Sequence, residues 1–246
     1  MKMRINAKGL SFRELNQRIR EVAANGADEI ELVNVNGQRY IGSGVDQNPI
    51  IKIYGTPGND LGAFMGSSKI LVYGDCEDGV GNTMSNGEIM VYGSAGDIVG
   101  YSMRGGKIYI KGNAGYRVGI HLKASRERSP VIVIGGSVRD FLGEYMAGGT
   151  IVVLGFGVNN GEIVGDFVGT GIHGGKVYVR GKVQKDKIGL DAVIAPMRDE
   201  DWVELKRILI DYCKAFNLRL RSLPKTKFTK IVPTSSRPYG KTYALE

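Results

Sequence analysis

Apolar positions repeat along residues 51–181, and each repeat contains a short strand that ends at a glycine. The residues two and four places before that glycine are Ile or Val every time, whereas the residue directly before it varies. A period of two with β-branched residues on one side predicts a strand with one buried face. The closing glycines are Gly55, Gly74, Gly93, Gly112, Gly135, Gly155 and Gly181. The predicted inward residues are Ile51, Ile53, Ile70, Val72, Ile89, Val91, Ile108, Ile110, Val131, Val133, Ile151, Val153, Val177 and Val179.

The spacing of these glycines predicts a solenoid. The first three intervals are 19 residues each (74−55, 93−74, 112−93), and the next three are 23, 20 and 26. A second glycine follows each strand and lies between apolar residues, as in Leu61-Gly62 with Met65. A fixed period of this length is typical of stacked coils that bury their strands against each other. We therefore expect a mainly β protein, a right-handed, single-stranded parallel β-helix about 30 Å long, at roughly 4.8 Å per coil.

The termini differ from the repeat and predict short helical additions. Ser11 to Glu14 forms a capping box ahead of an apolar face of Phe12, Leu15, Ile19, Val22 and Ala23. Residues 29–41 are interpreted as a hairpin that turns at Asn36-Gly37. We expect residues 1–46 to cap the first coil, residues 47–183 to form the β-helix, and residues 184–246 to hold a second helix and a basic tail.

The second predicted helix spans residues 199–216 and is expected to pack on the solenoid or cap its last coil. Its apolar stripe is Trp202, Leu205, Leu209, Tyr212, Cys213 and Phe216. The tail beyond it has no helical period, so we expect either a disordered end or an arm that lies along the solenoid or a neighbouring subunit. Removing residues 225–246 should then leave the β-helix folded.

Two insertions lengthen the regular unit. Residues 123–130 add four residues before the next strand, and residues 156–168 add seven. Insertions in a regular stack form surface loops. They are expected either to contact partners or only to extend the surface.

Composition excludes several classes of function. The net charge is +8, but residues 214–246 carry eight Lys and Arg against one Glu, which leaves +1 for the rest. The basic charge therefore belongs to the tail, and without an aromatic–basic platform it does not indicate nucleic-acid binding. No apolar stretch is long enough to cross a membrane, and no signal peptide is recognised. Two widely separated cysteines, Cys76 and Cys213, fit a reducing compartment, so a cytoplasmic location is expected.

Several motifs invite a chemical interpretation, but none predicts a catalytic, cofactor-binding or metal-binding residue. Residues 169–174 match the GxGxxG dinucleotide pattern, yet a strand follows where that motif requires a helix. His121 and His173 have no partners at metal-ligand spacing. An acyltransferase of the left-handed β-helix type would need a period of six, which the inward positions lack. The turn residues Asp78, Asp97, Arg117 and Asp140 recur at similar offsets, which is more typical of solvated turns than of an active site.

The repeat resembles a known family. The residues that carry the resemblance are 58–62 (GNDLG), 96–100 (GDIVG), 103–106 (MRGG), 115–119 (GYRVG) and 143–149 (GEYMAGG). From residue 34 to 181 they are similar to the glycine-repeat (GXGXG) domain at the C-terminus of the glutamate synthase large subunit. The same repeat occurs in a subunit of formylmethanofuran dehydrogenase.

The resemblance implies a right-handed β-helix that carries no catalytic residue and packs between an amidotransferase domain and an FMN-containing synthase domain. This sequence lacks the nucleophilic N-terminal cysteine, the synthase barrel and the cysteine cluster of that family. We therefore expect a separate structural subunit with no activity alone. FMN and an iron–sulfur cluster are expected on the partner subunits, and the chain could also form a homo-oligomer. The alternatives are a subunit of a formylmethanofuran-dehydrogenase-like complex and a stand-alone binding solenoid.

Overall fold

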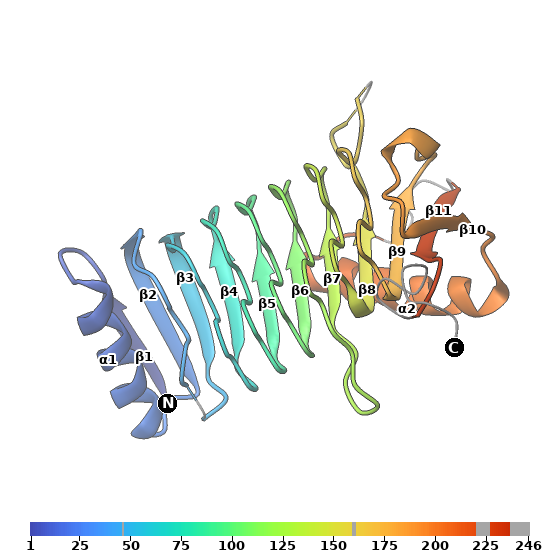
Figure 1. Ribbon diagram of the computed structural model, residues 1–246. Helices are drawn as coiled ribbons and strands as arrows, with labels where there is room; N and C mark the ends of the chain where they lie inside the picture. Colours follow the sequence, from blue (N-terminus) through green and yellow to red (C-terminus); the bar gives the residue numbers. More distant parts are fainter. Residues whose placement is uncertain (46, 159–160, 220–226, 237–246) are drawn as a thin grey trace.

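The protein forms an elongated β-solenoid with one helix at its N-terminal end and another along its side (Figure 1). The computed structural model describes residues 1–45, 47–158, 161–219 and 227–236. Its described strands make one sheet in the order β1-β2-β3-β4-β5-β6-β7-β8-β9-β11-β10. Neighbours from β1 to β9 are parallel, whereas β11 is antiparallel to both β9 and β10. The predicted parallel β-solenoid is confirmed.

The elements have the following bounds. The helices are α1 (Phe12–Ala24) and α2 (Asp199–Ala215), with a 3₁₀ turn η1 (Lys185–Lys187). The strands are β1 (Lys2–Asn6), β2 (Glu29–Asn36), β3 (Ile50–Thr56), β4 (Lys69–Tyr73), β5 (Glu88–Val91), β6 (Lys107–Ile110), β7 (Val131–Ile134), β8 (Ala147–Val153), β9 (Gly174–Arg180), β10 (Ala192–Ala195) and β11 (Phe228–Pro233).

The inward residues form continuous columns through the stack. Ile51, Ile70, Ile89 and Ile108 are neighbours in register, and each is fully buried. The apolar residues around the second glycines, such as Leu61 and Met65, are buried in the same core. Each Ile or Val so buried contributes about 1.5–3 kcal/mol relative to an exposed side chain. The core therefore runs the length of the rod.

One coil departs from the predicted pattern. In β7 the inward residues are Ile132 and Ile134, which align with Ile108 and Ile110, whereas the predicted Val131 and Val133 face outward. The glycine equivalent to Gly112 is consequently Gly136, because its carbonyl accepts a hydrogen bond from Gly155 N (2.9 Å). The prediction was wrong by one residue. β7 is apolar on both faces (VIVI), so alternation could not fix its phase, and the first insertion is five residues long.

The predicted N-terminal hairpin is also wrong. Residues 29–36 form β2, which pairs in parallel with β1 on one side and β3 on the other. A bulge between Val33 and Val35 shifts the register by one residue, so Val35, and not a glycine, is in register with Gly55 of β3. The segment that follows makes a corner like those of later coils. The first coil therefore begins about one unit earlier than the sequence pattern indicated.

Each corner contains three alternate residues in the left-handed region of φ. They are residues 40, 42 and 44; 60, 62 and 64; 79, 81 and 83; 98, 100 and 102; 117, 119 and 121; 141, 143 and 145; and 167, 169 and 171. The middle residue is always glycine. At Gly81, with φ +71°, an added Cβ would collide with Ile108 Cδ1 of the adjacent coil. The corner thus requires glycine both for its backbone and for the space it leaves to the core.

Helix α1 closes the N-terminal end of the core. Ser11 Oγ accepts a hydrogen bond from Glu14 N (3.3 Å), and the Glu14 carboxylate accepts one from Ser11 N (2.8 Å), as the capping box predicts. Leu15, Ile19 and Ala23 are buried in the core, whereas Phe12 remains 37% exposed. The predicted capping role of this helix is confirmed.

Candidate functional site: the outer sheet face and its buried ion cluster

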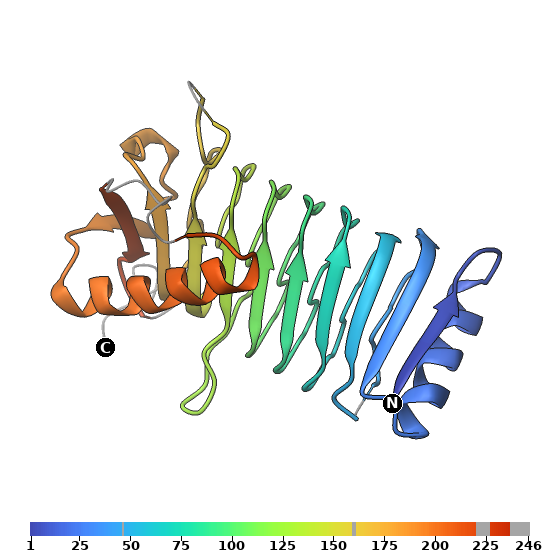
Figure 2. The ribbon, with the colours of Figure 1, turned by 180° about the vertical axis from the view of Figure 1, so that it is seen from behind.

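Helix α2 lies lengthwise along the rod and covers the outer face of strands β5–β9, the face that points away from the solenoid interior (Figure 2). Its buried stripe includes Leu205, Ile208, Leu209, Tyr212 and Phe216. These side chains pack on outward residues of successive strands, namely Met90, Tyr109, Val133, Val152 and Tyr178. The predicted helix on the solenoid is confirmed. Trp202 is the exception in the predicted stripe, since it is 43% exposed and meets Phe228 edge-on.

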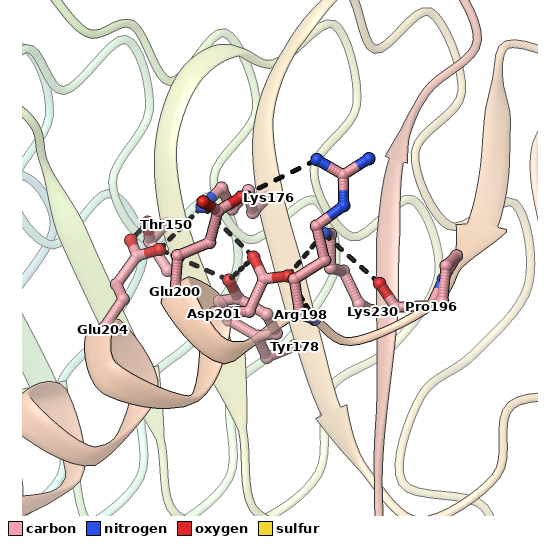
Figure 3. Close-up of polar contacts among 9 residues, drawn as sticks. All are labelled: Thr150, Lys176, Tyr178, Pro196, Arg198, Glu200, Asp201, Glu204 and Lys230. Atoms are coloured by element: carbon pink, nitrogen blue, oxygen red, sulfur yellow. Dashed lines mark hydrogen bonds and ion pairs between the residues drawn. The ribbon is translucent and has the colours of Figure 1, made fainter.

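A buried carboxylate joins α2 to the end of the sheet (Figure 3). Asp201 is fully buried in the first turn of α2. It accepts hydrogen bonds from Lys230 Nζ (2.6 Å), Tyr178 Oη (2.9 Å) and Arg198 N (2.9 Å). Lys176 Nζ lies 3.3 Å away. Three segments that are distant in sequence, α2, β9 and β11, therefore meet at one carboxylate.

These contacts determine the charge of Asp201. Burial by itself raises the pKa of a carboxyl group, because it penalises the charged form. The bonds from Lys230, Arg198, Tyr178 and Lys176 outweigh burial and hold the pKa of Asp201 well below its usual value. Lys230 is itself only 7% exposed, so the pair is an internal one. Removing either partner would leave the other charge buried, which costs several kcal/mol.

Glu204, one turn further along α2, extends the cluster to β8. Its carboxylate accepts hydrogen bonds from Thr150 Oγ1 (2.8 Å) and from Lys176 Nζ (2.8 Å). Burial raises the pKa of Tyr178, as do its bonds to Asp201 and Glu204. Every charged group of this cluster is thus engaged by a neighbour. The arrangement is suited to fastening α2 and β11 to the last coils rather than to proton transfer with a substrate.

The basic tail contributes a strand to this end of the molecule. Residues 228–233 form β11 between β9 and β10, so an arm along its own solenoid is confirmed for these residues. Two parts of the predicted tail, residues 220–226 and 237–246, lie outside the described residues. Because β11 carries Lys230 and covers the edge of β9, removing residues 225–246 would also expose Asp201. We therefore expect the deletion to disturb the last coil, whereas the sequence alone predicted that the β-helix would stay folded.

The motif residues from the sequence that the structure describes take part in the corners and in contacts between coils. Gly169 and Gly171 are left-handed corner residues, and strand β9, not a helix, begins at Gly174. The Asp78, Asp97 and Asp140 carboxylates each accept a backbone N–H from the next coil, at 2.8–2.9 Å. They therefore join successive coils, which is a more definite role than the solvated turn that was predicted.

The remaining candidates are also held by neighbours. Arg117 pairs with Glu144 (2.7 Å) and lies over the Phe141 ring. The His121 ring stacks on Tyr145, with centroids 5.3 Å apart, and His173 Nδ1 lies 3.1 Å from Gly171 O. Among the described residues no group of three or more His, Cys, Asp or Glu side chains could hold a metal ion. No described helix is long and apolar enough to cross a membrane.

The Tyr109 hydroxyl differs from the other buried polar groups. It lies under α2, where its ring meets Tyr212 edge-on, and burial raises its pKa. Within the described ranges it is the one buried side-chain oxygen or nitrogen without a hydrogen-bond partner. A buried hydroxyl group without a hydrogen-bond partner lowers the stability of the fold. The interface between α2 and the sheet therefore contains an unsatisfied polar group at Tyr109.

Comparison with known proteins identifies the repeat. A model of the GXGXG motif family matches residues 14–234, which is most of the chain. The chain belongs to the GXGXG motif family. It is also similar to the uncharacterized protein MJ1350 of Methanocaldococcus jannaschii, with 48% identity over 248 residues that cover 97% of this chain and 95% of that protein. The family predicted from the glycine repeat is thereby confirmed, and the match extends beyond the repeat to α2 and β11.

The sequence pattern missed the Asp201 cluster. Its members come from positions 150, 176, 178, 201, 204 and 230, and no spacing rule joins them. One signal was available for the covered face. The residues three places before the closing glycine are apolar or aromatic from Leu71 onward, including Met90, Tyr109, Val152 and Tyr178. Apolar residues on both sides of a strand indicate that both faces are covered.

Proposed function

We propose that this chain is a non-catalytic structural subunit of a glutamate-synthase-type oxidoreductase. In this role it would hold an amidotransferase subunit and an FMN-containing synthase subunit in one assembly, in the cytoplasm. Membership of the GXGXG motif family supports the proposal, as does the elongated, rod-like shape of the fold. The buried free thiols of Cys76 and Cys213 fit a reducing compartment.

The observation that carries the proposal is the use of the repeated carboxylates. Asp78, Asp97 and Asp140 are the residues that would suit acid–base chemistry at the corners, and each accepts a backbone N–H of the next coil. Each of these carboxylates is thus engaged in joining two coils. The chemistry of glutamate formation is accordingly assigned to partner subunits, on which FMN and the iron–sulfur cluster would reside.

Two other assemblies are compatible with the family. The chain could be the β-helix subunit of a formylmethanofuran-dehydrogenase-like complex, or a solenoid that binds a partner on its own. Identification of the stable partners distinguishes the three. An amidotransferase and an FMN synthase support the first, and a molybdopterin subunit supports the second.

Reconstitution tests the proposal. Co-expression with the amidotransferase and FMN synthase subunits of the same genome should yield a ternary complex. Its glutamine-dependent conversion of 2-oxoglutarate to glutamate should fall when this chain is omitted, while each partner keeps its own partial reaction. Glutaminase activity or a stoichiometric flavin in the isolated chain would overturn the structural role.

A variant of one corner carboxylate sharpens that experiment. Asp97→Asn keeps an oxygen that can accept the bond from Tyr116 N, now 2.8 Å, but cannot serve as a base. The assembled complex should therefore retain its rate with this variant. A large fall in kcat without loss of assembly would place chemistry on this chain.

A further inference from the structure

The outer sheet face continues beyond the end of α2. Helix α2 covers β5–β9, but the same face of β3 and β4 carries apolar and charged side chains that no described segment covers to the same degree. We call this surface the open half, and it consists of Ile50, Lys52, Tyr54, Lys69, Leu71 and Tyr73. Ile50 is 36% exposed, and Tyr54 and Tyr73 are each 40% exposed. These values contrast with Tyr109 and Tyr178, which α2 buries almost completely.

The contacts of α2 show how this face holds a helix. Glu204 binds Thr150 and Lys176, and seven residues later Asp211 binds Lys107 (2.7 Å). Seven helical residues rise about 10.5 Å. The register places Thr150 two strands from Lys107, which is about 9.6 Å. The rise of seven helical residues therefore matches the distance across two strand spacings of the sheet.

The same column of the sheet extends this match to the open half. Lys107 is in register with Glu88, and Glu88 with Lys69, so Lys69 lies two strands beyond Lys107. Lys69 pairs with Glu88 at 3.2 Å, but its side chain remains 39% exposed. An acidic residue one heptad further along the line of α2 would meet Lys69 as Asp211 meets Lys107.

The aromatic residues also continue from the covered half. Tyr54, Tyr73 and Tyr92 stack with centroids 4.9 Å apart, and the Phe216 ring at the end of α2 meets Tyr92 edge-on at 5.1 Å. Because the rings stack on one another, the ring faces within the stack are occupied, and the stack exposes mainly edges and hydroxyls. Nucleobases bind ring faces, whereas tyrosine edges with hydroxyls are frequent in protein interfaces. The open half is therefore suited to a protein.

We propose that the open half binds an amphipathic helix of a partner protein, placed end to end with α2, with an acidic residue paired to Lys69. This inference rests on the proposed function, since it needs a partner subunit. This chain does not continue α2 there, because Asn217 takes a left-handed conformation (φ +52°) and ends the helix. A second copy does not offer such a helix among its described residues, because α1 and α2 bury their apolar stripes in their own rod.

Binding measurements on the reconstituted complex test the inference. Tyr73→Arg introduces a long charged side chain into the open half, and Lys69→Glu reverses the charge that the partner is expected to meet. Each should weaken binding of one partner subunit by tenfold or more in a titration. Tyr116→Arg is the matched control, since Tyr116 lies at a corner away from this face and is 42% exposed. It should leave the dissociation constant unchanged. All three variants should melt within a few degrees of the unmodified chain.

The outcomes separate the inference from the proposed function. If the unmodified chain binds neither subunit, the proposed function fails. If it binds and Tyr73→Arg and Lys69→Glu bind equally well, the inference is overturned and the proposed function stands. A chain that ends at Ser236 should keep its affinity, and a loss confined to that truncation would also overturn the inference. Changing the acidic residue of the partner helix to Lys should restore binding of the Lys69→Glu variant but not of the Tyr73→Arg variant. A loss of binding caused only by a change in the fold of this chain would not be restored in this way.

Discussion

The two halves of the outer sheet face have the same backbone but different surfaces. Across β5–β9 the central outward column is Met90, Tyr109, Val133, Val152 and Tyr178, and α2 buries it. The equivalent residues of β2 and β3 are Glu31 and Lys52, in register with Leu71 of β4. Two charged residues at one end of the column give way to apolar residues at the other. The interior column does not change in this way, so the difference reflects what covers the outside and not how the coil folds.

The largest effect is expected beneath both halves, in the shared core. Ile110→Asp should prevent folding, because it would bury an unpaired carboxylate in a dry stack. Lys111→Asp, at the exposed next position, should fold and melt near the unmodified protein. Circular dichroism and thermal melts of the two variants provide the measurement. Similar melting temperatures would contradict the assignment of inward and outward positions. Tyr92→Asp is a poorer control, because the Tyr92 hydroxyl donates to Ala215 O (3.3 Å).

The second-largest loss of stability should distinguish the two halves of the outer face directly. Val152→Asp places a charge beneath α2 and should lower the free energy of unfolding by roughly 3 kcal/mol or more. Leu71→Asp makes a similar change in the same outward column of the open half, where Leu71 is only half-buried at the border of the α2 cluster, and it should cost clearly less. Urea titrations followed by circular dichroism measure both. Equal losses would mean that the open half is as tightly covered as the other.

The ion cluster gives the next effect. Lys230→Met should destabilise the C-terminal end by about 3 kcal/mol, since Asp201 would remain buried with fewer donors. Lys227→Met removes an exposed charge from the same segment and should change little. Adding Asp201→Leu to Lys230→Met should recover part of the loss. A double variant less stable than the single would show that the pair is not the source of the effect.

Acid should produce the smallest of these changes. The folded-state pKa of Asp201 lies below its unfolded value of about 3.9. The group therefore contributes stability above that unfolded value, and the contribution is lost as pH falls below about 4. Trp202, the one tryptophan of the chain, packs on Phe228 of β11 and can report this by fluorescence. Asp201→Asn should reduce the change in Trp202 fluorescence between pH 5 and 3. An unchanged acid transition in that variant would assign it to other carboxylates.

The sequence was sufficient for the fold because each coil repeats the same physical requirement. Inward Ile and Val, corner glycines and the capping box of α1 are local signals, and the structure bears them out at nearly every position. The pattern failed where local signals conflict. Residues 131–134 are apolar on both faces, and the bulge after Val33 hides the first coil.

The candidate site was less accessible to such reasoning. The contacts within the ion cluster around Asp201 and Glu204 join residues up to 54 positions apart, as Thr150 and Glu204 illustrate. Their proximity follows from the path of the chain after β9, which no periodicity encodes. The change from charged to apolar residues along the outer column was visible in the sequence, but its meaning required knowledge that α2 runs along the rod.

The regular coil also means that the number of repeats sets the length of the molecule. Strands β4, β5 and β6 follow one another at intervals of 19 residues and in unbroken register. Loss or duplication of one such unit would alter the separation of the two ends by a single increment of about 4.8 Å. The α1 cap and the Asp201 cluster would each keep their own contacts. Evolution can thus adjust the length of the rod in discrete steps without redesigning either end.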